Sequence, residues 1–361
     1  MFRSAGLTCR VWLCYGSQYK AALAERDATA KNRPEIRGGL TFGGRHVPRL
    51  PLSTRKVITA VPGSPSISAC GAHTMDVMTT STRTPQTWFI TGASRGFGLL
   101  VAQEALRRGD RVIATARKTD GLAEQLDAGS DRALIVAVDV TDPSSIAAAV
   151  AAGLTQFGRI DVLLNNAGHG LLGAVEEVTD TAARAVFDVN VFGLLNVTRA
   201  ILPTMRAQRW GTVLNVSSVA GQSSSPGWGV YAATKHAVEA INTALHAETA
   251  PLGIRVTAIE PGPFRTDFLD SSSLLTEGSA ISDYDQTAGN ARRWAADSNH
   301  AQLGDPGKAA AIMVDLAHHD DPPMRLPMGS DCVERIETVL AQQHDEINVW
   351  RNVSLSTDYT D

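Results

Sequence analysis

A tyrosine and a lysine four residues apart, Tyr231 and Lys235, open a long stretch with helical character. The i, i+4 spacing places a phenol and an ammonium on one face of a helix. A free tyrosine titrates at about pH 10, and an adjacent cation lowers that pKa toward a useful range for proton transfer. Ser218 lies 13 residues before Tyr231, close enough for its hydroxyl to hold a carbonyl oxygen beside the phenol. These three side chains predict a site for general acid–base chemistry.

Three glycines punctuate the segment 91–98, which reads Thr-Gly-Ala-Ser-Arg-Gly-Phe-Gly and lies between an apolar run and an amphipathic one. A turn of this kind between a strand and a helix is typical of a dinucleotide site, where the helix N-terminus faces the pyrophosphate. The residues predicted to contact the cofactor here are Gly92, Ser94, Arg95, Gly96, Phe97 and Gly98.

Arg117 ends the second apolar run, 19 residues after Gly98, where an NAD-specific site would present an acid to the ribose hydroxyls. A guanidinium matches a 2′-phosphate by charge and geometry, whereas a carboxylate would repel it. Arg95 in the glycine turn supports the same preference. NADP(H) is therefore the predicted cofactor, although each arginine alone would also fit an ordinary surface position.

Polar residues follow the third and fourth apolar runs as well. An aspartate at a strand end can accept a hydrogen bond from an adenine amino group, although the Thr-Asp-Pro that follows also suits a helix cap. An Asn-Ala-Gly turn leaves room for an adenosine ribose. The cofactor contacts predicted from these two turns are Asp139, Val140, Asn166, Ala167 and Gly168. Within a later helical stretch, the poor helix former Asn190 predicts a kink that holds a water molecule next to the lysine.

Short apolar runs alternate with helical stretches from residue 87 onward. Strands are predicted at 87–91, 111–116, 133–138, 160–164, 212–216 and 255–259, and the longer helices at 144–157, 180–205 and 231–250. Nearly continuous apolar strands that alternate with helices predict an α/β fold, with a doubly wound parallel sheet covered on both faces. Ligands of such folds bind at the carboxyl ends of the strands, where the residues above are found.

With these motifs together, residues 87 to about 300 resemble a short-chain dehydrogenase/reductase of the common single-domain type. The matching positions are Thr91-Gly92-x3-Gly96-x-Gly98, Asp139, Asn165-Asn166-Ala167-Gly168, Asn190, Ser218, Tyr231-x3-Lys235 and Pro261-Gly262-x3-Thr266. The resemblance implies a Rossmann-type sheet ordered 3-2-1-4-5-6-7 in one domain. It also implies subunit contacts through the two long helices that begin near Asp180 and Tyr231, and hence a homodimer or homotetramer.

The same resemblance implies roles for individual residues. Tyr231 would be the general acid/base, and Ser218 would polarise the substrate carbonyl. Lys235 would bind the nicotinamide ribose and lower the tyrosine pKa, while Asn190 would hold a proton-relay water. The remaining cofactor contacts implied are Pro261, Gly262, the backbone of Phe264 at the carboxamide, and Thr266 near the pyrophosphate.

The activity implied is that of an NADP-dependent oxidoreductase, a ketoreductase that interconverts a carbonyl and a secondary alcohol by hydride transfer. A lid expected at 268–302 mixes apolar and polar residues, which fits a medium-sized hydrophobic ketone or alcohol but also ordinary helix packing. The alternative is a non-catalytic NADP-binding sensor of the same fold. Such relatives usually lose the tyrosine or the lysine, and this chain keeps both.

The composition of the chain limits the other functions that it could have. The chain has 361 residues, 43% of them hydrophobic and 19% charged, as expected for a soluble globular protein. No apolar run approaches the roughly 18 residues of a membrane span, and the arginines of the first 86 residues are scattered outside any nucleic-acid-binding motif. A small-molecule substrate is therefore expected, without a membrane or nucleic-acid partner. No cluster of metal ligands accompanies the site, so no metal is expected.

The chain divides into a predicted basic, poorly structured extension at 1–84, a dehydrogenase/reductase domain at 85–350 and a tail at 351–361. The extension could be an organelle transit peptide, but we favour a translation start at Met75 or Met78. Of four cysteines only Cys332 falls in the domain, which fits a reducing compartment and predicts a cytoplasmic protein.

Overall fold

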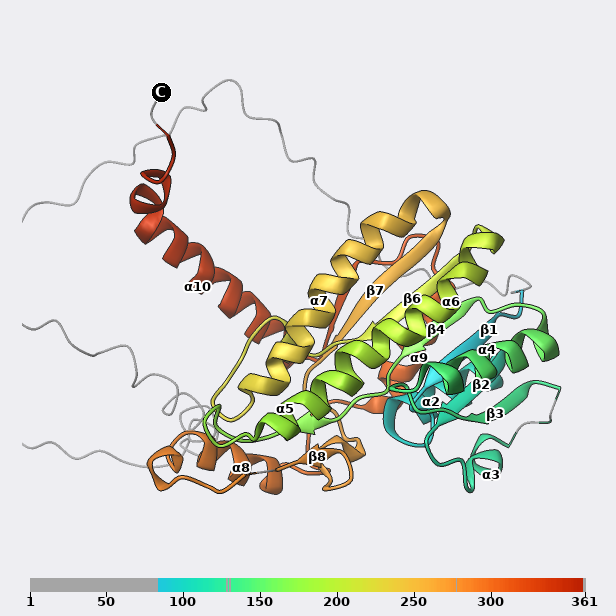
Figure 1. Ribbon diagram of the computed structural model, residues 1–361, viewed down its shortest axis with the longest axis horizontal. Helices are drawn as coiled ribbons and strands as arrows, with labels where there is room; N and C mark the ends of the chain where they lie inside the picture. Colours follow the sequence, from blue (N-terminus) through green and yellow to red (C-terminus); the bar gives the residue numbers. More distant parts are fainter. Residues whose placement is uncertain (1–83, 128, 130, 277, 360–361) are drawn as a thin grey trace, which may run out of the picture. The chain divides into compact units, whose positions relative to one another are not determined.

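The computed structural model describes residues 84–359 apart from 128, 130 and 277, so the predicted N-terminal extension lies outside the described residues. A parallel sheet with strand order β3-β2-β1-β4-β6-β7-β9 forms its centre (Figure 1). Its strands are β1 (Thr87–Thr91), β2 (Arg111–Ala116), β3 (Ala133–Ala137), β4 (Val162–Asn165), β6 (Gly211–Val216), β7 (Ile254–Pro261) and β9 (Arg325–Met328). Counted within this sheet alone, the order is 3-2-1-4-5-6-7, and the predicted Rossmann-type fold is confirmed.

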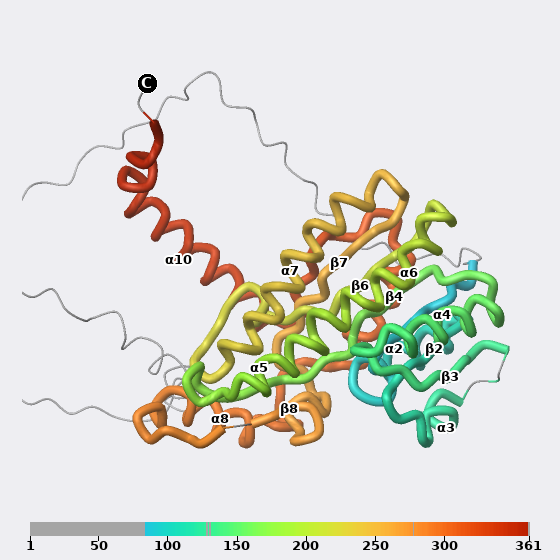
Figure 2. The backbone as a smooth tube through the Cα atoms, in the orientation of Figure 1, coloured from blue at the N-terminus to red at the C-terminus, as the bar shows by residue number. Residues whose placement is uncertain are grey.

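Helices cover both faces of the sheet, as Figure 2 shows. They are α2 (Gly96–Arg107), α3 (Leu122–Leu126), α4 (Pro143–Phe157), α5 (Asp180–Phe187), α6 (Leu194–Gln208), α7 (Gly229–Thr249), α8 (Ala288–Asp297), α9 (Pro306–Ala317) and α10 (Ser330–Leu355). One apolar core joins the sheet to α2, α3 and α9, and a second joins it to α4, α6 and α7. This two-sided burial explains why the strands read as unbroken apolar runs.

Buried polar side chains tie the centre of the sheet to the helix that carries the candidate tyrosine. The Asn165 amide donates to the side-chain oxygens of Thr198 and Asn215, and the Asn215 amide donates to the Asn242 side chain on α7. Because a buried amide without partners would destabilise the fold, these bonds fix α7 against β4 and β6.

One helical stretch, Asp180–Gln208, is long and apolar enough to cross a membrane if only length and composition are considered. It comprises α5, a π-helical turn at Asp188–Gly193 and α6. The α6 residues Val197, Ile201 and Met205 are fully buried in the core beneath the sheet. Packing within a globular domain therefore accounts for much of its apolar character.

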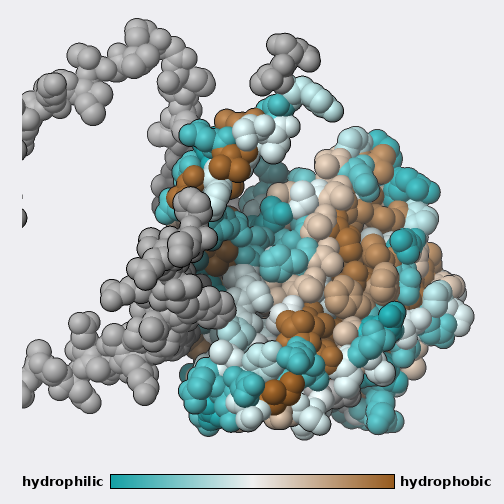
Figure 3. Space-filling model, turned by 60° about the vertical axis from the view of Figure 1, so that its left-hand side comes forward, coloured by the Kyte–Doolittle hydropathy of each residue, from teal (hydrophilic) through white to brown (hydrophobic). Residues whose placement is uncertain are grey.

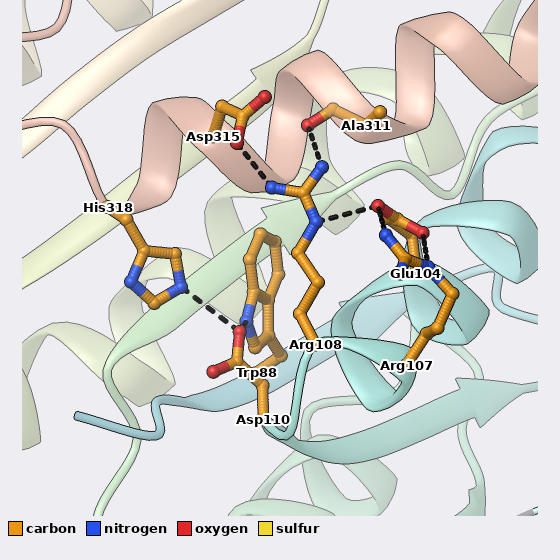
Figure 4. Close-up of polar contacts among 8 residues, drawn as sticks. All are labelled: Trp88, Glu104, Arg107, Arg108, Asp110, Ala311, Asp315 and His318. Atoms are coloured by element: carbon orange, nitrogen blue, oxygen red, sulfur yellow. Dashed lines mark hydrogen bonds and ion pairs between the residues drawn. The ribbon is translucent and has the colours of Figure 1, made fainter. Parts of the chain in front are cut away.

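At the amino ends of the strands, opposite the candidate site, a polar cluster fastens α9 to α2 and to the sheet (Figure 4). The fully buried Asp110 carboxylate accepts a hydrogen bond from the Trp88 indole at 3.0 Å and lies 3.1 Å from His318 Nε2. Arg108 on the loop after α2 contacts Asp315 on α9. Two segments about 200 residues apart in sequence are thus held together, at the end of the sheet away from the candidate active site.

The C-terminal helix α10 runs to Leu355, five residues beyond the boundary predicted at 350. Its first turns lie against the body of the molecule, near β9, and the rest projects outward (Figure 1).

Candidate active site

The residues singled out in the sequence gather at the carboxyl edge of the sheet. Each lies at the end of a strand, in the loop that follows it, or on an adjacent helix: Gly92, Ser94, Arg95, Gly96, Phe97 and Gly98 after β1, Arg117 after β2, Asp139 and Val140 after β3, Asn166, Ala167 and Gly168 after β4, Ser218 after β6, Pro261, Gly262, Phe264 and Thr266 at the end of β7 and beyond, Asn190 between α5 and α6, and Tyr231 and Lys235 on α7. This is the edge at which doubly wound folds bind their ligands.

Tyr231 and Lys235 lie on the buried face of α7, with side chains only 5% and 7% exposed. The Ser218 hydroxyl lies beside the Tyr231 phenol, whose pKa it lowers, and it caps a short turn by accepting from the Ala220 amide. Lys235 Nζ donates to the Val216 carbonyl at 2.8 Å and lies 5.8 Å from the centre of the Tyr231 ring. A proton donor, a second hydroxyl and an ammonium therefore share one confined space.

Burial is the main influence on the pKa values of Tyr231 and Lys235. It raises the pKa of Tyr231 well above its usual value, and the hydrogen bond from Ser218 offsets this only in part. The net shift of the Tyr231 pKa is therefore upward, whereas the sequence analysis expected Lys235 to lower it. Burial also lowers the pKa of Lys235 to about 8, against the opposing charge of Glu239. A protonated phenol is the form that can donate to a carbonyl oxygen.

Asn190 lies in the π-helical turn Asp188–Gly193, where the helix departs from regular geometry as its sequence suggested. Its amide donates to the His169 carbonyl at 3.0 Å and to the Thr234 hydroxyl at 3.2 Å, and its oxygen accepts from the His169 amide at 3.0 Å. Asn190 thus connects the loop after β4 with the turn of α7 that lies between Tyr231 and Lys235.

The glycine turn has the geometry that a phosphate-binding loop requires. Gly92 has a positive φ of 66°, and a Cβ atom on Gly98 would lie 2.2 Å from the Gly92 carbonyl oxygen, so neither position accepts a side chain without a shift. Helix α2 begins within this segment, at Gly96, with no acidic residue in its first turn and no side-chain cap. Its N-terminal amides are thus left to bind an anion, which fits the pyrophosphate of a dinucleotide.

The loop after β7 lies against the glycine turn. The rings of Phe97 and Phe264 meet edge to face with centroids 5.3 Å apart, and Gly96 faces Thr266. The Thr266 amide donates to the Phe264 carbonyl at 2.8 Å. Two segments far apart in sequence therefore form the two sides of one cradle.

The two arginines expected at the 2′-phosphate are placed differently. Arg117 is exposed at the end of β2, and its charge helps to lower the pKa of Asp139, whose carboxylate mainly accepts hydrogen bonds from Thr141. Arg95 instead donates to the side chain and the carbonyl of Ser272, each at 2.7 Å. Both arginines are exposed, but Arg95 links the glycine turn to the segment that follows β7.

Aromatic rings cover the tyrosine. The rings of Phe268 and Trp228 pack against Tyr231, with centroids 5.6 Å and 5.7 Å from that of the tyrosine ring. Trp228 belongs with Leu172, Leu274 and others to a small apolar cluster between α7 and the segment 268–302. Phe268, from the segment predicted as a lid, therefore packs against the phenol, and the segment adds apolar groups to the cluster.

The lid is anchored by a buried ion pair that the sequence did not reveal. The Glu177 carboxylate accepts from the Arg292 guanidinium at 2.7 to 2.9 Å, and from the backbone amides of Ile281 and Ala174. Burial alone would raise the pKa of Glu177, but these hydrogen bonds outweigh it and lower the pKa. Nearby, the two-residue strands β5 (Gly170–Leu171) and β8 (Leu274–Leu275) pair in parallel.

Two buried carboxyl groups lie near Lys235. One is on α7, one helical turn beyond the lysine, and the other is on β7. Glu239 on α7 and Glu260 on β7 both approach Arg325, at 2.9 Å and 3.9 Å from its Nε, and Gln222 donates to Glu260 at 2.7 Å. Burial and the neighbouring Glu239 raise the pKa of Glu260 to about 7, against the hydrogen bond from Gln222 and the charge of Arg325. The sequence analysis had given these acids no role.

Residues 86–277 match the sequence model of the short chain dehydrogenase family. The chain belongs to this family. Oxidoreductase BOA17 of Botryotinia fuckeliana is 38% identical over 274 residues, which cover 75% of this chain and 98% of that protein. The 3-ketodihydrosphingosine reductase of Bacteroides thetaiotaomicron is 35% identical over 245 residues, which cover 68% of this chain and 88% of that protein. A crystal structure of a short-chain dehydrogenase from Streptomyces avermitilis superposes with a TM-score of 0.72 at 39% identity, covering 76% of this chain and all of that one.

Two structural neighbours were solved with nicotinamide dinucleotides. A 3-ketoacyl-(acyl-carrier-protein) reductase from Brucella melitensis, 27% identical with a TM-score of 0.56, was solved with NADH and covers 67% of this chain and 96% of its own. A serine dehydrogenase, 27% identical with a TM-score of 0.57, was solved with NADP+. The match covers 67% of this chain and 94% of that one. This member of the short-chain dehydrogenase family is accordingly an oxidoreductase with a nicotinamide cofactor.

Proposed function

We propose that this short-chain dehydrogenase is an NADP(H)-dependent carbonyl reductase, or secondary-alcohol dehydrogenase, for medium-sized hydrophobic substrates. The observation that carries the proposal is the buried Tyr231 phenol with the Ser218 hydroxyl beside it and Lys235 on the same face of the helix. Such a pair can hold a carbonyl oxygen between two hydroxyl groups while one of them donates a proton.

Four residues of this chain would each have a separate role in the reaction. Ser218 would donate a hydrogen bond to the carbonyl oxygen, and Tyr231 would give it a proton. The chemistry that a bound nicotinamide supplies is transfer of a hydride to or from the substrate carbon. Lys235 would hold the ribose hydroxyls, and its positive charge would favour the phenolate left after proton transfer. Asn190 would keep α7 in register with the loop that bears His169.

Arg117 supports a preference for NADP(H). Its guanidinium is exposed at the strand end next to which the adenosine ribose would lie, and Asp139, whose pKa its charge helps to lower, accepts hydrogen bonds from Thr141. We assign the 2′-phosphate contact to Arg117, since Arg95 is bonded to Ser272.

The apolar lid supports a hydrophobic substrate. Trp228 and Phe268 flank the phenol, and Leu172 and Leu274 lie in the apolar cluster under the lid. The similarity to a protein named as a 3-ketodihydrosphingosine reductase agrees with an apolar ketone of this kind.

The proposal is tested by supplying the purified full chain with NADPH or NADH and a series of ketones of increasing apolar size. Oxidation of NADPH that depends on the ketone, and that is faster than oxidation of NADH, is the expected result. Tight binding of NADPH without turnover of any ketone or alcohol would instead favour the non-catalytic sensor.

A further inference from the structure

Two buried acids lie near Lys235 without a part in the proposed reaction. Figure 3 shows many hydrophilic residues, in teal, on the surface of the molecule, whereas Glu239 on α7 and Glu260 on β7 are only 5% and 1% exposed. Arg325 on β9 lies beside both, with its Nε 2.9 Å from a Glu239 oxygen and 3.9 Å from a Glu260 oxygen. Burial of two acids beside one base costs stability, which makes this cluster a candidate for a role in function.

Glu239 packs between the lysine and the turn that begins at Ser218. It lies one helical turn after Lys235, about 6 Å along the axis of α7. A Cβ atom added to Gly221 would lie 2.9 Å from Glu239 Cγ and 3.2 Å from the Lys235 carbonyl oxygen. Gly221 ends the short turn Val219–Gly221, which Ser218 caps. The charge of Glu239 also raises the pKa of Lys235, against the effect of burial.

Glu260 holds the other end of the same turn. Gln222, the residue after the turn, donates from its side-chain amide to a Glu260 carboxylate oxygen at 2.7 Å. The amide of Ser217, just before the turn, donates to the Ile259 carbonyl at 2.7 Å. Both ends of the segment that carries Ser218 are thus tied to β7, one of them through the side chain of Glu260.

Other titratable groups face α7 and the two acids from several elements. Tyr231 shares the buried face of α7, and Cys332 on α10 donates to the Glu260 carbonyl, but burial raises the pKa of both side chains, which therefore stay neutral. The remaining groups are exposed, lie beside Cys332, contact Asn190 or belong to the far end of β7: Asp180, Arg184, Asp188, His236, Asp331, Arg335, His169 and Arg255. Among the charges of the described residues, that of Glu239 is the one that acts on the Lys235 pKa.

We propose that Glu239 and Glu260 are positioning residues of this active site, with Glu239 maintaining the positive charge of Lys235 and Glu260 holding the Ser218 turn through Gln222. The two acids share one guanidinium, so a single cluster sets both the lysine and the serine. The inference rests on the proposed function where it concerns reduction of a ketone. Where it concerns cofactor binding it does not, because the lysine would bind the ribose of any nicotinamide dinucleotide.

The first test measures the dissociation constant of NADPH by fluorescence, with the full chain, between about pH 7 and pH 9.5. Lys235 has a pKa of about 8, so binding should weaken across this range, and Lys235→Met should lack this pH dependence. Glu239→Gln removes the charge but keeps an acceptor for Arg325. It should move the pH at which binding weakens downward by about one unit. Glu239→Asp keeps the charge and should move it much less.

Glu248→Gln is the matched control for the first test. It makes the same change on an exposed turn of α7, about 20 Å along the helix from Lys235, and should leave the midpoint at its wild-type pH. A midpoint that stays in place in Glu239→Gln, or that shifts equally in Glu248→Gln, would overturn the proposal. The measurement needs no substrate, so it decides this point even if the chain reduces no ketone and the proposed function fails.

The second test concerns the Ser218 turn and uses none of the Glu239 variants. Gln222→Ala removes the bond to Glu260, so single-turnover reduction of a ketone that the wild type reduces should slow by about tenfold or more. The NADPH dissociation constant should stay near that of the wild type. The Ala220 amide, which donates to Ser218 Oγ, should exchange hydrogen faster.

Two further variants make the second test specific to this contact. Glu260→Gln keeps an acceptor for Gln222 and should preserve both the rate and the slow exchange. Gln103→Ala removes a hydrogen bond of similar length, 2.8 Å, from a side chain on α2 and should also behave like the wild type. An unchanged rate or unchanged exchange in Gln222→Ala would overturn the proposal, as would an equal loss in Gln103→Ala.

Discussion

Glu177 and Arg292, 115 residues apart in sequence, form a buried bidentate ion pair that holds the lid over the candidate tyrosine. The same carboxylate accepts the Ile281 amide from within the lid. One side chain from the loop after β5 therefore fixes two points of the segment that lines the substrate side of the site.

Replacing Glu177 by Gln should disturb the lid more than the cofactor site. The amide cannot balance the Arg292 charge, so the lid should shift, and kcat/KM for the ketone should fall by about 10- to 100-fold, as expected for an ångström-scale misplacement. The NADPH dissociation constant should stay near that of the wild type. Asp180→Asn, which breaks the fully exposed pair with Arg184, is the matched control. Equal effects of the two variants would contradict a positioning role for Glu177.

Arg117→Asp should weaken NADPH binding much more than NADH binding, because attraction to the 2′-phosphate becomes repulsion. The dissociation constant of NADPH should rise by about 10- to 100-fold, the loss expected for one charge-assisted contact. Arg111→Asp makes the same charge change at the other end of β2 and should leave both constants unchanged. Titrations of cofactor fluorescence measure all four values. An unchanged preference in Arg117→Asp would move the phosphate site to Arg95.

Glu260 should make the stability of the domain depend on pH. Its pKa of about 7 lies above the usual 4.5, so between these values the native state holds a proton that the unfolded chain has released. The contribution of Glu260 to stability is thus fully present below about pH 4.5 and is lost as the pH rises through about 7.

Glu260→Gln should remove the contribution of this residue to the pH dependence of the unfolding free energy. Urea unfolding of the wild type and the variant, between about pH 5 and pH 8, measures the difference. Glu248→Gln, which changes an exposed carboxyl group on α7, is the control. If the pH dependence of the unfolding free energy persists unchanged in Glu260→Gln, the proton that the native state retains is not on Glu260.

Much of the fold could be predicted from the sequence because its signals are local. The strand at 87–91 and the helix that opens before Tyr231 follow from apolar runs and their spacing, and the glycine turn follows from positions that exclude a Cβ atom. The carboxyl edge of the sheet then brings these motifs together without further information.

The remainder depends on contacts between distant segments. The bond from Arg95 to Ser272 spans 177 residues, and nothing near Arg95 in the sequence indicates it. The raised pKa of Tyr231 has the same origin, because rings that include Phe268, from the lid, bury the phenol that the lysine alone would have made more acidic. Side-chain burial by another element is not visible in a local pattern.

The most direct test of the proposed mechanism is the single-turnover rate of NADPH oxidation by Tyr231→Phe with a good ketone substrate. The change removes one hydroxyl group and little volume, so the fold and the NADPH dissociation constant should be retained, while the rate falls by about 10²- to 10⁴-fold or more. A variant that binds NADPH normally and still reduces the ketone at close to the wild-type rate would show that another group supplies the proton, and the assignment of this site would be wrong.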